Sequence, residues 1–132
     1  MANYTYTYGG NLIINGMDFD AVTLKALLVM TNTTADTEKD KTTISGFTTL
    51  DEMDGTGYSR QTLTVTNTVD TTNHWTRVSA TITFPNVSAG TRQVQGVVVY
   101  EFVTNDADSV PVFWFDTVTG ITFPFDTPAG SG

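Results

Sequence analysis

Few side chains in this sequence could carry out chemistry. The chain has one histidine, His74, and no cysteine, which excludes thiolate catalysis and cysteine-based zinc sites. A serine or threonine triad would have to use His74, which stands between a turn and an expected strand, a position typical of surface residues. Because no nucleophile, base and orienting acid occur in a recognisable pattern, we predict no catalytic residue and no enzyme activity.

The carboxylates are the second candidates for chemistry. They cluster at three points: Asp18 and Asp20, then Asp51, Glu52 and Asp54, then Asp106 and Asp108. Paired acids could serve glycoside hydrolysis or bind Ca²⁺. The stretch 51–55 is the most similar to a Ca²⁺-binding loop, but its carboxylates do not have the D-x-D-x-D-G spacing of such loops. All three clusters lie in expected turns or loops, where solvation explains them, so we predict no metal and no cofactor.

Aromatic residues could form a face that stacks on sugar rings. The candidates are Tyr4, Tyr6, Tyr8, Tyr58, Trp75 and Trp114. Most of them occupy expected strand positions, where packing in a core or at an interface is the simpler use of an aromatic ring. Carbohydrate binding therefore stays an alternative and not the main prediction.

The charge balance limits the possible partners. Six Lys and Arg residues stand against 14 Asp and Glu residues, for a net charge of −8. Nucleic acids and anionic membranes both select basic surfaces, so we predict neither as a partner. No run is apolar enough to span a membrane, and the start has no basic and then apolar segment, so no signal peptide is expected. The lack of cysteine fits a reducing cytoplasm.

The elements that must hold these side chains are predicted to be strands. Thr makes up about a fifth of the chain, and β-branched residues favour extended backbone. Apolar and polar residues alternate in short runs, separated by turn residues at intervals of about 10 residues. Such runs predict strands at 58–66, 75–84 and 121–125, with a turn at 70–73. We predict an all-β fold, a single antiparallel β-sandwich of jelly-roll or immunoglobulin-like type with about eight strands.

Two stretches are expected to form the scaffold. Residues 92–115 predict a hairpin with its acidic turn at 105–108, and Val98, Tyr100, Phe113 and Phe115 are expected in the core. Residues 20–30 predict a strand inside a sheet. Its even-numbered residues from Val22 to Met30 face one way, and Lys25, Leu27 and Val29 face the other.

The remaining segments are expected to hang from this scaffold. Residues 1–10 alternate Tyr and Thr and predict an arm or an edge strand, with a strand expected at 3–8 and another at 11–14. Residues 31–54 predict a long excursion with a short helix at 48–53 capped by Thr48. The β-sandwich domain is expected to span residues 11–125, and residues 126–132 are expected to form a flexible tail.

A family resemblance rests on short patterns that occur in order. They are the strand at 22–29, the turn Leu50-Asp51-Glu52, the stretch Gly55-Thr56-Gly57-Tyr58, the strand Ala80–Phe84 and the strand Gly96–Tyr100, followed by a polar turn and an apolar strand closing in Asp116. In these features residues 22–125 resemble the small decoration proteins, or cement proteins, of tailed-bacteriophage heads. The start at Tyr4-Thr5-Tyr6 and the end at Phe123-Pro124-Phe125 depart from the family pattern.

The resemblance implies a structural protein without catalytic residues. It implies a β-sandwich that binds and stabilises the lattice of the major capsid protein, often as a homotrimer. The protein would be made in the bacterial cytoplasm and would lie on the outside of the capsid. Six residues of the start and the excursion are then the expected interface: Tyr4, Tyr6, Tyr8, Phe47, Leu50 and Met53. The alternative is a tail, baseplate or head-fibre component that binds a host surface glycan.

Overall fold

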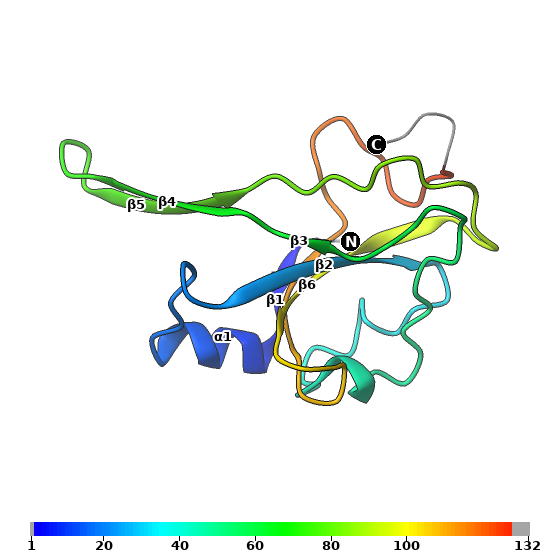
Figure 1. The fold of residues 1–132 in the computed structure, drawn as a ribbon, viewed down its shortest axis with the longest axis horizontal. Coiled ribbons are helices and arrows are strands. Elements are labelled where there is room, and N and C mark those ends of the chain that lie inside the picture. Colours follow the sequence, from blue (N-terminus) through cyan, green and yellow to red (C-terminus); the bar gives the residue numbers. More distant parts are fainter. Residues whose placement is uncertain (1, 128–132) are drawn as a thin grey trace.

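The computed structural model describes residues 2–127, whose elements form two antiparallel sheets (Figure 1). The five-stranded sheet has the order β1-β7-β6-β2-β3, and the two-stranded sheet pairs β4 with β5. The elements are β1 (Tyr4–Thr5), α1 (Thr7–Ile14), β2 (Thr23–Met30), the 3₁₀ turn η1 (Ile44–Gly46), β3 (Gln61–Thr62), β4 (Val65–Asp70), β5 (Trp75–Ala80), β6 (Val94–Phe102) and β7 (Val110–Phe115). This arrangement confirms the predicted all-β, sandwich-like class, although the second layer is only a ribbon.

The five-stranded sheet is apolar on both faces. Strand β2 shows this most clearly, because Leu27 and Val29 belong to one core cluster and Leu24 and Leu28 to the other. The alternation predicted for residues 20–30 is therefore confirmed. Strand β6 pairs with β2 over its whole length, and its own partner β7 completes the predicted hairpin. Burying both faces makes β2 and β6 the centre of the fold.

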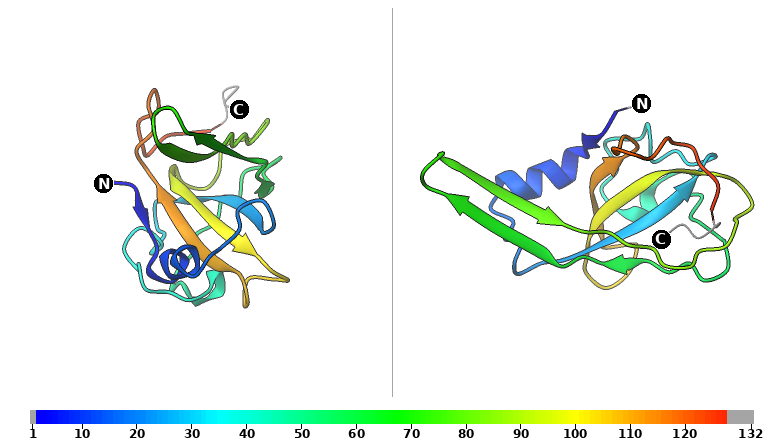
Figure 2. Two further views of the ribbon diagram at one scale, coloured as in Figure 1. Left: turned by 90° about the vertical axis from the view of Figure 1, so that its left-hand side faces the viewer. Right: turned by 90° about the horizontal axis from the view of Figure 1, so that it is seen from above.

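Each face of the sheet has its own cover (Figures 1 and 2). Helix α1 and the excursion at 31–54 lie over the face that carries Leu27 and Trp114, whereas the irregular segments at 81–90 and 116–127 lie over the face that carries Leu28 and Phe115. Gly96 has a packing role, since a Cβ there would lie 2.4 Å from the Trp114 ring. The sheet is thus sandwiched mainly by loops and a helix.

The N-terminal segment differs in part from the predicted strands at 3–8 and 11–14. The first strand is confirmed only at Tyr4–Thr5, which form edge strand β1, and helix α1 takes up residues 7–14. Gly9 and Gly10 typically end a strand, but here both lie inside the helix. A Cβ at Gly9 would lie 2.5 Å from the Pro111 oxygen and from the Val112 Cα, so glycine lets the helix touch β7 directly. This close contact offsets the poor helix propensity of two glycines.

The predicted helix at 48–53 is also wrong. Asp51 adopts a left-handed φ of 52°, and its carbonyl oxygen accepts a hydrogen bond from the Met30 N–H at 2.7 Å. The Met53 N–H donates to the Leu28 oxygen at 2.9 Å, and Glu52 forms a bridge with Val29. The segment therefore runs extended along β2, and the turn of helix in the excursion is η1, which begins at Ile44.

Strand pairing at the C-terminal side is shorter than predicted. The expected strand at 121–125 contributes bridges between Val118 and Ile121 and between Val94 and Phe125. The expected strand at 75–84 ends at Ala80, and Ile82 and Phe84 continue as irregular chain over the sheet. Most of the tail, residues 128–132, lies outside the described residues.

Candidate functional site

The N-terminal segment belongs to the body of the fold. Tyr4 and Thr5 form edge strand β1 and pair with Trp114 and Phe113 of β7. Tyr6 is fully buried in the core, and Tyr8 lies on helix α1 with 45% of its surface exposed. The three tyrosines therefore do not form one face: Tyr4 and Tyr6 point inward together, and only Tyr8 is open to a neighbour.

Tyr4 and Tyr6 connect the N-terminal segment to the excursion. Both hydroxyls donate to the carbonyl oxygen of Ala35, the Tyr6 bond measuring 2.6 Å, and the two rings pack edge to face at 5.0 Å. The Lys39 ammonium lies 4.5 Å from the centre of the Tyr4 ring. Burial raises the pKa of Tyr4 to about 12 and raises the pKa of Tyr6 as well. These contacts serve the structure of the domain.

The apolar residues of the excursion face inward. Phe47 packs in the same cluster as Tyr6, Leu50 packs against that cluster, and Met53 is buried on the other side of the sheet. The prediction that Tyr6, Phe47 and Met53 form an exposed interface is therefore wrong for the folded chain. Their place in a long polar loop predicts that they are available for partners, whereas here they cover the sheet that the loop crosses.

Glu38 holds the excursion together from outside. Its carboxylate accepts hydrogen bonds from the Thr48 N–H at 2.9 Å and hydroxyl at 3.0 Å, and it pairs with the Lys41 ammonium at 2.8 Å. Burial alone would raise the pKa of Glu38, but these hydrogen bonds and one with Thr34 outweigh it and lower the pKa to about 2. Glu38 is thus a structural carboxylate.

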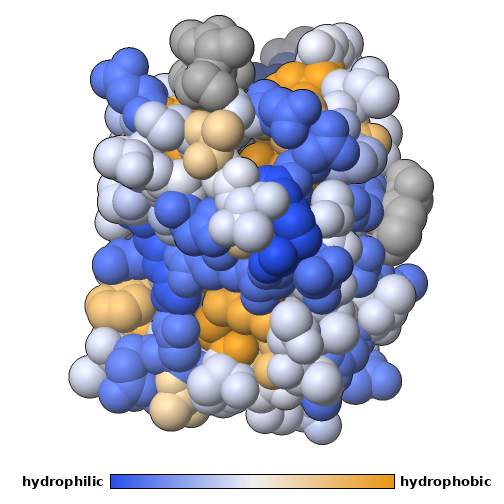
Figure 3. Space-filling view, turned by 90° about the vertical axis from the view of Figure 1, so that its right-hand side faces the viewer, coloured by the Kyte–Doolittle hydropathy of each residue, from blue (hydrophilic) through white to orange (hydrophobic). Residues whose placement is uncertain are grey.

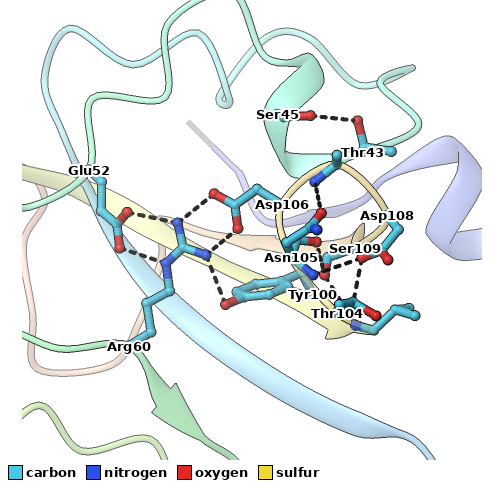
Figure 4. Close-up of polar contacts among 12 residues, drawn as sticks. Thr43, Ser45, Glu52, Arg60, Tyr100, Thr104, Asn105, Asp106, Asp108 and Ser109 are labelled. Carbon is cyan, nitrogen blue, oxygen red and sulfur yellow. Dashed lines mark hydrogen bonds and ion pairs between the residues drawn. The ribbon is translucent and has the colours of Figure 1, made fainter.

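Arg60 forms the most highly connected polar cluster (Figure 4). Its Nε and one terminal nitrogen donate to the two oxygens of Glu52, each at 2.8 Å. The terminal nitrogens also donate to Asp106 at 2.6 and 2.9 Å and to the Tyr100 hydroxyl at 3.1 Å. Because these bonds use all five N–H groups of the guanidinium, Arg60 has no donor left for a ligand.

The Arg60 cluster joins segments that are far apart in the sequence. Glu52 belongs to the excursion, and Asp106 belongs to the turn between β6 and β7. The Tyr58 hydroxyl donates to Glu52 at 2.6 Å and accepts the Leu28 N–H at 3.2 Å, which extends the cluster to β2. The hydrogen bonds with Glu52 and Asp106 raise the pKa of Arg60 above its usual value. The cluster clamps the excursion onto the sheet.

Other acidic side chains of the predicted clusters are also bound within the domain. Asp51 pairs with Arg92, Asp54 accepts the N–H and hydroxyl of Thr91, and Asp108 accepts the N–H groups of Thr104 and Asn105. Within residues 2–127 no three His, Cys, Asp or Glu side chains are placed to hold a metal ion. In the same range no helix is long and apolar enough to cross a membrane.

An apolar groove lies between the sheet and the irregular segments that cover it. Its main cavity measures about 360 Å³ and is lined on one side by Leu28, Val97 and Phe115, and on the other by Ile82 and Phe125. A smaller cavity of about 140 Å³ adjoins it, sharing Ile82 and Phe115, and reaches the base of the β4–β5 ribbon. The groove exists because the ribbon leaves the body before it covers the whole sheet.

The β4–β5 ribbon extends far beyond the body of the molecule (Figures 1 and 2). Every residue of β5 is exposed, and Val69, Val78 and Trp75 expose 71%, 44% and 39% of their surfaces. His74 lies in its turn with a φ of 60°, and the Arg77 guanidinium lies 5.3 Å from the Trp75 ring. Figure 3 shows the opposite end, where the surface is mainly hydrophilic and apolar atoms form small patches. The ribbon is therefore the strongest candidate for an interaction surface.

Sequence reasoning missed the ribbon and the Arg60 cluster. The sequence predicts strands at 58–66 and 75–84 around a turn at 70–73, whereas the paired strands lie at Val65–Asp70 and Trp75–Ala80. Alternation does not show that this pair of strands leaves the body. Arg60 and Asp106 are 46 residues apart in the sequence, and no local pattern predicts that they pair. Comparison of the chain with protein-family models, with curated proteins and with solved structures found no match. The class that the fold and the surface define is a sandwich-like β domain with a projecting ribbon.

Proposed function

We propose that this protein is a structural protein of a tailed-bacteriophage particle, a head decoration or cement protein that binds the lattice of the major capsid protein. The observation that carries the proposal is the projecting β4–β5 ribbon, whose apolar residues Val69, Trp75 and Val78 are exposed beyond a clamped body. A subunit that stabilises a lattice has to reach neighbouring subunits, and a rigid body with one long extension suits that task.

The energetics of a lattice favour such a design. Many copies of a small domain bind one surface, so weak individual contacts add up to stable attachment through high local concentration. The acidic body, with a net charge of −8 for the chain, discourages random association in a concentrated lysate. The order of short patterns over residues 22–125 supports the same proposal. The proposal includes a homo-oligomer, with a trimer favoured, on the capsid exterior.

The test locates the protein in the particle. Virions, tail-less heads and isolated tails of the phage that carries the gene are purified, and the chain is quantified in each by peptide mass spectrometry. We expect the chain in tail-less heads at a fixed ratio to the major capsid protein. Its absence from heads together with its presence in tails would overturn the head assignment.

The second candidate is a tail, baseplate or head-fibre component that binds a host glycan. It is favoured by one observation: Trp75 lies exposed near the end of the ribbon, where its ring could stack on a sugar. Specific binding on a glycan array, abolished by Trp75→Ala, would support this candidate. An array without signal, combined with the chain in heads, would leave the decoration role.

A further inference from the structure

The register of the β4–β5 ribbon sorts its residues onto two different faces. Val65 pairs with Ala80, Asn67 with Val78 and Val69 with Thr76, and residues directly opposite one another share a face. The other face carries the three pairs Thr66 with Ser79, Thr68 with Arg77 and Asp70 with Trp75. One face is thus mainly apolar, and the other carries the hydroxyls and charges.

The apolar face continues the groove of the body. Val65, Val78 and Ala80 line the smaller cavity together with Leu24 and Phe113 of the five-stranded sheet. Farther out, the face passes the end of the body, and there Val69 is the most exposed apolar residue of the ribbon. A continuous apolar strip therefore leads from a half-covered core to an uncovered tip.

An uncovered strip of this kind is unfavourable in water. A two-stranded ribbon by itself is at best marginally stable, because it has no layer to bury its apolar face. In this chain the base of the ribbon, as far as Val78, lines the smaller cavity of the groove, whereas Val69, nearer the tip, lines neither cavity. A second layer packed on this face would stabilise the ribbon in its extended position.

The charge distribution indicates what that layer is. Between residues 61 and 84 the charges of Asp70 and Arg77 cancel, so the whole net charge of −8 is carried by the rest of the chain. Two copies that met through their bodies would repel each other, whereas two copies that met through their ribbons would bring neutral surfaces together. A basic partner would instead be attracted to the body.

We propose that the apolar face of the ribbon is where copies of this chain associate, with Val69 and Val78 at the centre of the contact. The opposite face, which carries Trp75, then stays free for the lattice contacts proposed above. This inference names the contact surface of the homo-oligomer that belongs to the proposed function, and in that respect it rests on that proposal. Self-association in solution and presence in heads are separate measurements, so failure of the one can be told from failure of the other.

The test compares two lysine variants of the same strand. Val69→Lys places a charge on the apolar face, and Thr66→Lys places the same charge on the opposite face; both residues are exposed, so both variants should fold. Sedimentation velocity and light scattering measure the mass over a range of concentrations, and circular dichroism checks the fold. Val69→Thr, which keeps the β-branched shape, serves as a milder variant.

We expect an oligomer for the wild-type chain and for Thr66→Lys, and a loss of affinity of about tenfold or more for Val69→Lys, because a buried valine contributes about that factor and a buried lysine opposes association further. Added salt should strengthen the oligomer, since it screens the repulsion between acidic bodies. A wild-type monomer at all concentrations would overturn the inference. Equal association of both lysine variants, or dissociation by salt, would overturn it as well.

Discussion

Replacing Arg60 by Met tests whether the guanidinium cluster clamps the excursion to the sheet. The substitution keeps an unbranched chain of similar length and removes the charge and all five donors. Glu52 and Asp106 then face each other without the cation that now binds both, at 2.6 to 2.9 Å. The free energy of unfolding should fall through the loss of these bonds and through the repulsion between the two carboxylates.

The size of the loss follows from the exposure of the three side chains. Arg60 and Glu52 expose about a quarter of their side chains, 23% and 26%, and Asp106 exposes 38%. Breaking a fully buried pair costs about 3–5 kcal/mol, and breaking an exposed pair costs about 1 kcal/mol or less. Between these limits we expect Arg60→Met to cost about 2–3 kcal/mol, which lowers the melting temperature by about 6–12 °C for a chain of this length.

Urea denaturation at neutral pH measures this loss, with Arg77→Met as the matched control. Arg77 lies on the ribbon over the Trp75 ring, so its replacement should cost about 0.5 kcal/mol or less. Adding Glu52→Gln and Asp106→Asn to Arg60→Met should recover part of the loss, because both unpaired charges disappear. A cost of Arg60→Met no larger than that of Arg77→Met would refute the clamp, and no recovery in the triple variant would refute carboxylate repulsion as its source.

Three further predictions test the surroundings of this cluster. Glu38→Gln should lower the free energy of unfolding at pH 7 by about 1 kcal/mol after allowance for solvent screening. The pKa of Glu38 is about 2 in the folded chain, below its ordinary value of 4.5. In urea titrations the difference from wild type should therefore shrink as the pH falls from 4.5 to 2. Gly9→Ala should destabilise the fold, since its Cβ would meet the β7 backbone at 2.5 Å. In Gly10→Ala the new Cβ meets nothing closer than 3.5 Å, so this variant should stabilise helix α1 by up to about 1 kcal/mol. Thermal melts in which both variants shift the melting temperature in the same direction would contradict the docking of α1. Stability should also fall as the pH rises above 10, because tyrosine ionises near pH 10 in the unfolded chain, whereas the pKa of Tyr4 is about 12 in the folded chain. Tyrosinate absorbance should therefore rise together with the loss of circular dichroism. Ionisation of Tyr4 near pH 10 in the folded chain would speak against its burial.

The excursion at 31–54 contributes to the core of the fold and not to a binding surface. The excursion is long, polar and rich in threonine, features that usually mark a binding loop. Its apolar residues instead complete the core, and its charged residues Glu38 and Glu52 are engaged within the domain. The excursion is therefore not the leading candidate for binding partners, and the ribbon, whose β5 residues are all exposed, is the stronger candidate. For that reason the proposed lattice contacts and the proposed contacts between copies both involve β4 and β5.

The local sequence pattern was sufficient to predict the central strands of the five-stranded sheet. Alternation in β2 assigned Leu27 and Leu28 to opposite faces, and the two apolar runs around the turn at 105–108 predicted the β6–β7 hairpin. Both signals work because the side-chain period of a strand is two, and because a hairpin pairs residues that are close in sequence. The candidate interface was harder to predict, since burial of a loop residue such as Phe47 depends on what lies beneath it.

The residues alone describe an acidic, cysteine-free, threonine-rich chain, and their alternation predicts antiparallel strands around residues 20–30 and 92–115. Four further features emerge only from the folded chain: Gly9 lets a helix dock on β7, Tyr6 is core, Arg60 joins Glu52 to Asp106, and β4 and β5 leave the body. The physical reason is the distance along the sequence over which each effect acts. Strand propensity and alternation act between near neighbours, whereas docking, burial and clamping depend on groups that meet only after the sheet has formed.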